Sequence, residues 1–547
     1  MSSKEKIGEQ KLKLTKLAFF PPLAILGFFL IFGIVYEDGF LGVVDAIFFW
    51  IRANVGWGAS LLALSVVVVG VAAMFSKFGN VTIGGEGAKP ELSTFAWVSI
   101  AMITTMAAGV LFWGPAEPIA HYAYPPTGLV GVEPKTPEAV KFAMETMFIH
   151  WTIIPYAIYT VPAVVFGFMY YNGKRPFSIA SQMGPALGPY SERRTTIKIV
   201  DAITLFSIGA GMAGSVAQGF LSISSGLSNT LGIPDNAGTW LIIAIVLGAV
   251  VAFSAISGIQ KGLKTLSHIN VVGFCLLLLF LLIFSNIPYL LNLATEALGG
   301  FINNFFDRAL MTGGAARGIL PPDEFANSDY MWPQWWTTFY WFSWMAWAPT
   351  SGAFMGRIAY GRKVKHVLAM YIGLCASLSM FWMIVVSGTA LWTETSGAAD
   401  LIQAYSDGGA ANVAFAILGT MPLGNIVSLV FVFLVALSLV TACDSNTIAM
   451  AGISTVGITP ENPDAPKWIK LTWAFIVMGL GYIMIATIGE AGVRVIANFG
   501  GLVATIIMLG AVVSMILLIK NYKKYDKTLK DAPAEEKKEE APASAAE

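Results

Sequence analysis

The sequence has little charge for its length. Only 12% of its 547 residues are charged, and 33 basic against 33 acidic residues leave a formal net charge of zero. Soluble domains carry about 25% charged residues, whereas 56% of the residues here are hydrophobic. The composition predicts a polytopic membrane protein, and the zero net charge leaves no case for nucleic-acid binding.

Cysteine and histidine are also scarce. Cys275, Cys375 and Cys443 lie in separate apolar runs, which indicates neither a disulfide framework nor a zinc site. The four histidines fall in different segments, and the sequence contains no HExxH, phosphate loop or nucleophile elbow. We therefore expect no enzyme and no cofactor, apart from a coupling ion.

Acidic residues inside the apolar runs are few, and the candidates are Asp444, Glu117, Glu145 and Asp201. A buried acid costs several kcal/mol and marks either function or a paired structural bond. We expect Asp444, the deepest, to cap or pair with backbone rather than to relay protons. Glu117 is expected near the outer end of its helix.

The apolar runs predict twelve transmembrane helices, because about 20 apolar residues span a bilayer. They fall near residues 18–37, 55–76, 93–119, 141–171, 199–229, 239–257, 268–291, 333–358, 366–393, 423–451, 468–488 and 494–520. The first run has no cleavage site and is expected to remain in the membrane. Residues 1–17 are then an N-terminal segment, 18–520 the transmembrane domain and 521–547 a disordered tail.

Basic residues predict the topology, since cytoplasmic loops retain Lys and Arg. The loops on the N-terminal side hold fifteen and those on the opposite side six, the latter including Arg494. Both termini are therefore expected in the cytoplasm of a protein of the cytoplasmic (plasma) membrane. The pattern leaves no basic residue for the middle of a helix. Residues 292–310 have polar and apolar positions at helical spacing and predict an amphipathic helix at the outer surface.

Two predicted helices contain Gly-Pro interruptions at corresponding places. The third carries Gly109 and Gly114-Pro115, and the eighth carries Pro349 and Gly352. Two interrupted helices five apart indicate inverted repeats, here helices 3–7 and 8–12, with a substrate near the midplane. The alternative is that Gly and Pro are simply common in membrane helices.

The aromatic stretch from 332 to 362 contains six tryptophans. Tyr340, Trp344 and Trp347 share one helix face, and a row of ring faces attracts a weakly hydrated cation. Trp151 and Tyr159, two helical turns apart, would close an aromatic box against Trp344 and Trp347. An interfacial aromatic belt or plain packing is the alternative interpretation.

Hydroxyl groups on the tenth predicted helix suggest where a small cation would bind. Ser438, Thr441 and Ser445 lie on nearly one face. Such hydroxyls, with unwound backbone, supply the oxygens that sodium needs. Ordinary bonding of each hydroxyl to its own helix is an equally good interpretation.

Four motifs together resemble the betaine/choline/carnitine transporter family. They are FYWFSWMAWAPTSGAFMGRIAYGR, GVLFWGPAEP, HWTIIPYAIY and TACDSNT, and the resemblance covers about residues 15–520. It implies an all-α membrane protein of twelve helices with two five-helix inverted repeats, alternating access and a homotrimer.

The resemblance also implies a site. The aromatic box would comprise Trp151, Tyr159, Trp344 and Trp347. The family has a second tryptophan where this chain has Ser343, so we expect Ser343 to decide substrate identity. Trp341 or Phe342 would compensate for the missing ring, or the substrate would be smaller or more polar than betaine. Independently of the resemblance, we expect backbone amides near Gly109 to receive any substrate carboxylate.

For sodium, the resemblance implies a site at Thr441, with Ser438 and carbonyls near Met106. Ala442 stands where sodium-coupled relatives have a second hydroxyl. A further family site is expected to be lost, because Ile208 and Met212 replace its threonines.

These observations favour a secondary transporter of a quaternary ammonium or related methylated compound, of the glycine betaine, choline or carnitine class, coupled to sodium. One alternative is a sodium-independent exchanger of two methylammonium compounds. The other is a membrane sensor that binds without transporting.

Overall fold

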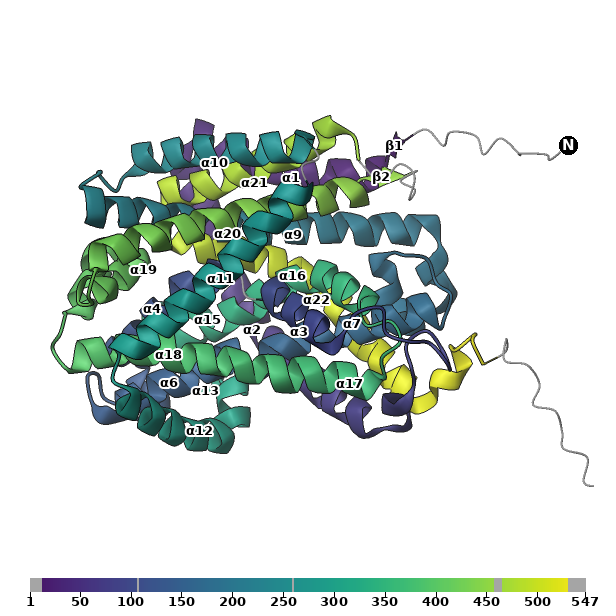
Figure 1. Cartoon of the computed structure of the whole chain (residues 1–547), viewed down its shortest axis with the longest axis horizontal. Helices are drawn as coiled ribbons and strands as arrows, with labels where there is room; N and C mark the ends of the chain where they lie inside the picture. Colours follow the sequence, from purple (N-terminus) through teal and green to yellow (C-terminus); the bar gives the residue numbers. More distant parts are fainter. Residues whose placement is uncertain (1–11, 106–107, 258–259, 457–464, 530–547) are drawn as a thin grey trace, which may run out of the picture.

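The computed structural model describes residues 12–105, 108–257, 260–456 and 465–529, which are almost entirely helical (Figure 1). Extended structure among these residues is limited to one isolated bridge and a short antiparallel pair, β1 (Lys13–Leu14) with β2 (Thr455–Val456). The predicted all-α fold is confirmed.

The helices follow one another without any long extended segment. They are α1 (Lys16–Val35), α2 (Glu37–Phe75), α3 (Thr94–Thr105), α4 (Ala108–Ala123), α5 (Thr127–Val130), α6 (Pro137–Trp151), α7 (Ile153–Tyr171), α8 (Gly184–Leu187), α9 (Arg194–Leu231), α10 (Ala237–Ser257), α11 (Gln260–Phe284), α12 (Ile287–Leu310), α13 (Gly314–Arg317), α14 (Pro322–Ala326), α15 (Trp332–Trp335), α16 (Thr337–Arg357), α17 (Val364–Leu368), α18 (Ala376–Thr395), α19 (Leu401–Gly419), α20 (Gly424–Ile453), α21 (Lys467–Ile488) and α22 (Ala491–Asn521). A π-helical segment, Ala369–Cys375, joins α17 to α18.

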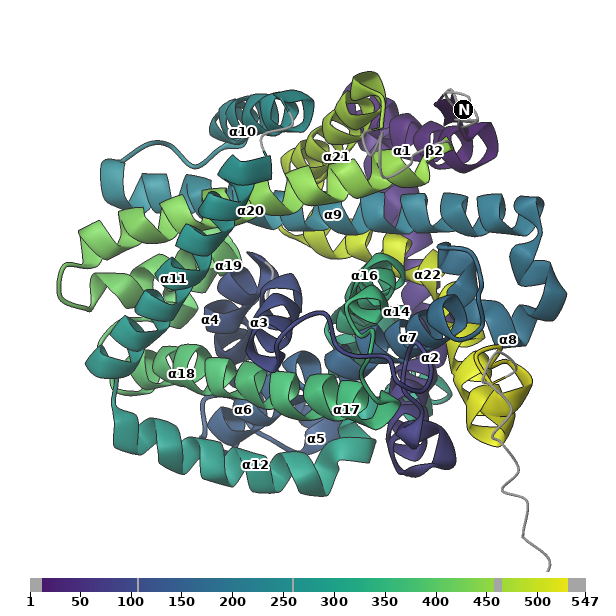
Figure 2. The same cartoon turned by 45° about the vertical axis from the view of Figure 1, so that its right-hand side comes forward.

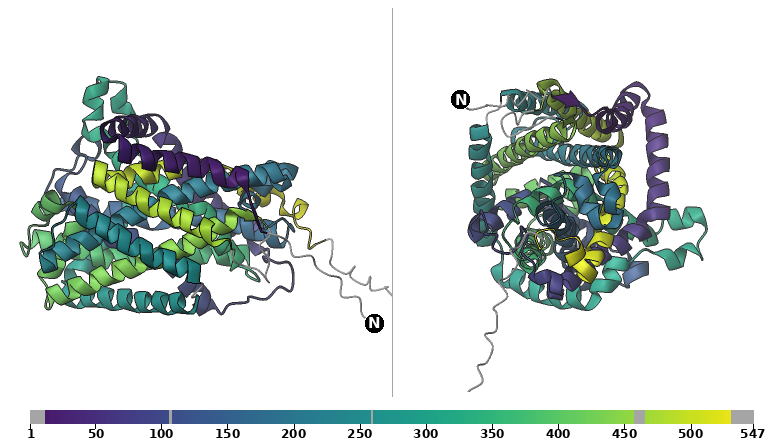
Figure 3. Two further views of the ribbon diagram at one scale, coloured as in Figure 1. Left: turned by 90° about the horizontal axis from the view of Figure 1, so that it is seen from above. Right: turned by 90° about the vertical axis from the view of Figure 1, so that its right-hand side faces the viewer.

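Helix α16, which carries the tryptophan-rich stretch, lies at the centre of the bundle. It packs against α7, α9 and α22. In Figures 1 and 2, α1, α10 and α21 lie along one edge and α12 along the opposite edge. The left view of Figure 3 places β1 and the end of α22 at the same end of the molecule.

Close packing around α16 requires glycine. A Cβ atom on Gly356 would lie 2.3 Å from the carbonyl oxygen of Ala163 in α7. One on Gly501 of α22 would lie 2.1 Å from the carbonyl oxygen of Phe342. Backbone oxygens cannot move aside as a flexible side chain can, so these glycines set the distance between the helices.

Every predicted membrane segment coincides with observed helix. Among the described residues, nine helical segments are long and apolar enough to span a membrane, and ten if the bent pair α11–α12 is one span. The predicted segments at 93–119 and 333–358 are not among them, so the twelve crossings and the inverted repeats stay predictions. The predicted amphipathic helix at 292–310 is present as α12, which meets α11 at 102°.

The predicted interruptions at Pro115 and Pro349 are wrong, because the helices continue through them, whereas the part of the first interruption near Met106 lies outside the described residues. Helix α4 runs through Pro115 and Pro118, and α16 runs through Pro349. Pro118 has no N–H for the carbonyl of Gly114 one turn earlier. The hydroxyl of Ser387 in α18 donates to that carbonyl instead, at 2.7 Å. A neighbouring helix therefore supplies the bond that the proline removes.

Candidate functional site

Aromatic side chains of α6, α7 and α16 surround a small pocket. Trp344 stands edge-on to Trp151 and Tyr159, with ring centroids 5.4 and 5.7 Å away. The cavity volume is about 10 Å³, about the space that one water molecule needs. The rings must therefore separate before a larger molecule enters. The lining residues are Val110, Trp151, Pro155, Tyr156, Tyr159, Trp344 and Ser379.

A break between α6 and α7 shapes this pocket. Thr152 has φ −119° and ψ −109°, outside helical values, and a proline three residues later cannot donate a backbone bond. The exposed carbonyls are bonded by other helices. Trp344 Nε1 donates to the carbonyl of His150 at 3.0 Å, and the Ser379 hydroxyl donates to that of Trp151 at 2.7 Å. Hydrogen bonds to carbonyls at the break thus connect α16 and α18 to the pocket.

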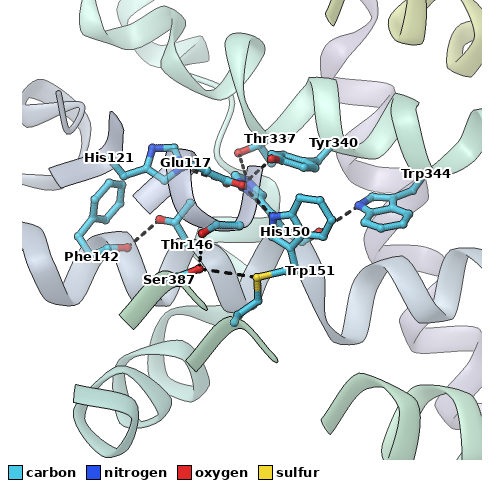
Figure 4. Close-up of polar contacts among 12 residues, drawn as sticks. Glu117, His121, Phe142, Thr146, His150, Trp151, Thr337, Tyr340, Trp344 and Ser387 are labelled. Atoms are coloured by element: carbon cyan, nitrogen blue, oxygen red, sulfur yellow. Dashed lines mark hydrogen bonds and ion pairs between the residues drawn. The ribbon is translucent and has the colours of Figure 1, made fainter. Parts of the chain in front are cut away.

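Beside the pocket, the carboxylate of Glu117 in α4 is fully buried and accepts four hydrogen bonds (Figure 4). Its Oε1 accepts from His150 Nδ1 at 2.6 Å and from His121 Nε2 at 3.1 Å. Its Oε2 accepts from Trp151 Nε1 at 2.7 Å and from the hydroxyl of Tyr340. Four donors offset the large cost of burying a carboxylate. They also join the acid directly to the pocket wall.

The acid and its two histidines form a hydrogen-bonded triad. The polar atoms of Glu117, His121 and His150 lie within 4.8 Å of one another. However, Glu117 Oε1 is itself at hydrogen-bond distance from both rings, and His150 Nε2 lies 3.1 Å from the hydroxyl of Thr337. This leaves no space for an ion between the carboxylate and the rings.

Arg494, in the first turn of α22, covers the triad. Its guanidinium carbon lies 4.0 Å from the ring centroid of Trp336 and 4.8 Å from that of Trp113. Trp336 lies 4.6 Å from the ring of His121. Glu490 lies one turn before Arg494 and forms an ion pair with it, with 3.8 Å between Glu490 Oε1 and Arg494 Nη2. We call Arg494, Trp336 and Trp113 the lid.

Two basic residues assigned to loops are instead buried in helices. Lys470 and Arg494 are 3% and 9% exposed and lie in the first turns of α21 and α22. The loop assignment is therefore wrong for both. Lys470 Nζ donates to the carbonyl of Ala255 at 3.3 Å, and the aromatic faces of the lid hold Arg494. Such contacts allow charge at a buried helix end.

The structure brings four of the seven predicted substrate residues together. Trp151, Tyr159 and Trp344 line one pocket. Gly109 of α4 lies beside it, since a Cβ atom there would be 3.8 Å from Cη2 of Trp151. A Cβ atom on Gly109 would also lie 3.2 Å from Oε1 of Gln218, so the backbone here is closely approached from α9.

The other three predicted residues do not line the pocket. Trp341 is fully buried, edge-on to the ring of His150 at 5.9 Å. Trp347 faces α9, where a Cβ atom on Gly211 would lie 3.3 Å from its Nε1. Ser343 is half-buried on α16.

The predicted sodium residues are only partly described. Met106 lies outside the described residues, and Ser438 is buried on α20. The hydroxyl of Thr441 donates to the carbonyls of Leu437 and Ser438, at 2.9 and 3.0 Å. This is the alternative interpretation, in which the hydroxyl bonds its own helix. Ile208 and Met212, at the second family site, are both buried on α9.

Two functional features were missed from the sequence. Tyr156 lines the pocket, and its signal was available, because it lies one turn before Tyr159 and shares its face. Glu117 was identified only as an acid near a helix end, although it lies at the centre of the hydrogen-bond network. Asp444 is buried in α20 near Ser254 and Lys470.

Comparison with known proteins finds one matching family model and several relatives. Residues 17–524 match the model described as BCCT, betaine/carnitine/choline family transporter. Glycine betaine transporter 2 of Vibrio parahaemolyticus is 27% identical over 93% of this chain and 89% of its own length. Glycine betaine transporter OpuD of Bacillus subtilis is 27% identical over 91% and 93%. The ectoine/hydroxyectoine transporter of Virgibacillus pantothenticus is 25% identical over 90% and 94%.

Proposed function

The chain belongs to the betaine/carnitine/choline transporter family, and from this premise we propose that it carries a quaternary ammonium or related methylated compound by alternating access. As a family member it is a multi-pass membrane transporter and not an enzyme. Relatives named for glycine betaine and ectoine favour a small substrate that combines a cationic head with a carboxylate.

The aromatic pocket is the observation that carries this proposal. Trp151, Tyr156 and Tyr159 are buried, and together with the half-buried Trp344 they line one pocket. Each desolvated cation–π contact contributes about 2 kcal/mol, so three or four rings approach the roughly 8 kcal/mol of micromolar binding. The cationic head would lie among the rings, and the carboxylate would point toward the backbone at Gly109.

Sodium is the coupling ion in this proposal. It would bind at Thr441, Ser438 and carbonyls near Met106, with the Thr441 hydroxyl turned away from the helix carbonyls that it now bonds. We further propose a homotrimer in the cytoplasmic membrane with both termini inside. β1 and the end of α22 lie at the same end of the molecule (Figure 3). A chain whose two ends lie on one side crosses the membrane an even number of times, which supports this topology.

Exchange is the second candidate, and it rests on α9. Ile208 and Met212 offer no oxygen where a second sodium would bind, so fewer ions would drive uptake. An uptake rate that does not depend on sodium but rises when vesicles are preloaded with substrate would favour the exchanger. Binding without any flux would favour a sensor.

Uptake by the purified protein in vesicles tests the proposal. Labelled glycine betaine, choline, carnitine and ectoine are compared with and without sodium, and tryptophan fluorescence reports binding. Trp344→Leu is expected to weaken binding at least tenfold. Trp57→Leu is the matched control, because Trp57 is 61% exposed and its indole donates to the nearby carbonyl of Asn54. Near-normal uptake by Trp344→Leu contradicts the aromatic box.

A further inference from the structure

The buried triad has one open position for a proton. His121 is fully buried, and its Nε2 faces Glu117 Oε1. Its Nδ1 has no hydrogen-bond partner among the described residues. When Nε2 carries the hydrogen that bonds the carboxylate, Nδ1 of the neutral ring retains a free lone pair. A buried ring nitrogen without a partner is rare and calls for an explanation.

The charges around the triad make this position suited to a proton. The four donors to Glu117 are neutral when both rings are neutral, so the carboxylate keeps its charge. A proton on His121 Nδ1 creates an imidazolium already in contact with that carboxylate. The pair becomes neutral overall without moving a side chain, which limits the cost of burying both charges.

Within the described part of the chain, the neighbouring elements add one positive group and no second acid in direct contact. Arg494 faces the triad through the lid, and its own partner Glu490 lies beyond it. Asp444 of α20 has Ser254 and Lys470 as its neighbours instead. Thr337 and Tyr340 from α16 contact the triad directly, and Arg494 from α22 faces it through the lid. Tyr405 from α19 bonds Glu490 beyond Arg494.

The triad also lies between the two regions that must open in turn. On one side, Trp336 of the lid covers the ring of His121. On the other, Trp151 Nε1 bonds Glu117 while its ring lines the pocket. The carbonyl of His150 further accepts from Trp344, the opposite wall of the pocket (Figure 4). A change in the triad's charge therefore acts directly on both the lid and the substrate site.

We propose that Glu117, His121 and His150 form a proton-binding site, and that one proton crosses the membrane with each substrate molecule. This rests on the proposed transport function. The proton enters from the outer solution when the lid is open and binds Nδ1 of His121, forming one N–H bond. It leaves to the inner solution when the pocket opens inward, and that same bond breaks. The triad returns to its starting state without any other reactant.

The test uses the full chain in vesicles that have equal sodium concentrations on both sides and contain a pH-sensitive dye. Glycine betaine added outside is expected to acidify the lumen. A gradient of one pH unit, acid outside and with no membrane potential, is worth about 1.36 kcal/mol. It is therefore expected to drive up to about tenfold accumulation of a zwitterion. His121→Gln keeps a donor toward Glu117 but has no second basic nitrogen, and it is expected to lose this acidification and accumulation.

The chain supplies matched controls, because its other two histidines, His268 and His366, are exposed. His268→Gln and His366→Gln are expected to acidify the lumen as the unmodified protein does. His150→Gln serves as a second test variant if His121→Gln does not fold, with substrate-induced fluorescence change as the check of folding.

The outcomes separate this proposal from transport itself. Substrate flux without acidification in the unmodified protein overturns the proton site and leaves the transporter in place. Acidification that survives both His121→Gln and His150→Gln also overturns it. Absence of both binding and flux for every substrate contradicts the proposed function instead.

Discussion

Trp151 joins two functions in one side chain. Its ring lines the pocket, and its indole N–H donates to Glu117. Phenylalanine separates the two, because it keeps an aromatic face and removes the N–H. A hydrogen bond to a charged group contributes about 1.5–3 kcal/mol, so the Glu117 network should loosen while the pocket remains aromatic.

We predict that Trp151→Phe weakens substrate binding roughly tenfold, which corresponds to about 1.4 kcal/mol. The reason is that Glu117 no longer holds the ring in its edge-on position against Trp344. A fluorescence or calorimetric titration measures the change. Trp382→Phe is the control, since its buried Nε1 has no hydrogen-bond partner among the described residues. Equal affinities for the two variants would exclude a positioning role for the indole bond.

At the scale of single residues, the sequence predicted which side chains share a face of one helix. It did not predict which side chains from different helices meet. Trp151 and Tyr159 share a face by simple periodicity. The donors to Glu117 come from α4, α6 and α16, and Tyr340 is 223 residues away in sequence. No local pattern indicates such a network, so Glu117 could be recognised from the sequence only as a costly acid.

At the level of helices, composition predicted the presence of the long helices better than the positions at which they break. The apolar runs located the long helices, but the expected breaks at Pro115 and Pro349 were wrong, because α4 and α16 continue through these prolines. The actual break at Thr152 lies beside the pocket. Helix α19 was not predicted, and it contains a kink at Gly409, where φ is 69°.

The contact between α16 and α22 yields a prediction about packing. A Cβ atom on Gly501 would lie 2.1 Å from a backbone oxygen of Phe342, so Gly501→Ala must push the two helices apart. Such overpacking costs roughly 1–3 kcal/mol. We expect a lower thermal unfolding midpoint in detergent and weaker substrate binding, because α16 carries Trp344.

Gly299→Ala provides the comparison for this packing prediction. Gly299 lies within α12, and a Cβ atom there meets nothing within 4 Å. Alanine is favoured over glycine inside a helix by about 0.8–1.0 kcal/mol, so its midpoint should stay the same or rise. If Gly501→Ala unfolds at the same temperature as Gly299→Ala, the close approach does not constrain the helices.

For the whole molecule, the two predicted crossings that fail the apolar-length criterion both contribute residues to the site. The 93–119 segment contains Glu117, and its described helices α3 and α4 are each too short to meet the criterion. The 333–358 segment contains Tyr340 and Trp344, and α16 is long enough but not apolar enough. For α16, the tryptophan, tyrosine and hydroxyl side chains lower the hydropathy, so composition predicts this central helix less clearly than the helices around it.

The carboxylate of Glu490 contacts several groups beside the lid. Glu490 Oε2 accepts from the backbone N–H of Ala410 at 2.7 Å, next to the kink in α19. Its Oε1 faces Arg494 at 3.8 Å and the hydroxyl of Tyr405 at 3.4 Å. Burial, reinforced by the nearby Glu490 carboxylate, raises the pKa of the Tyr405 phenol, so this hydroxyl stays protonated and donates. Glu490 thus connects α19 to the lid.

We predict that Glu490→Gln loosens this connection and opens the lid end more often. The amide keeps an oxygen for Ala410 but loses the charge that faces Arg494. Hydrogen exchange should become roughly tenfold faster at the amides around Gly409, equivalent to about 1.4 kcal/mol of local stability. Glu296→Gln, an exposed acid on α12, should leave exchange in α19 unchanged. If both variants exchange like the unmodified protein, the charge of Glu490 does not hold the lid, and closure at this end depends on the aromatic contacts of Arg494 alone.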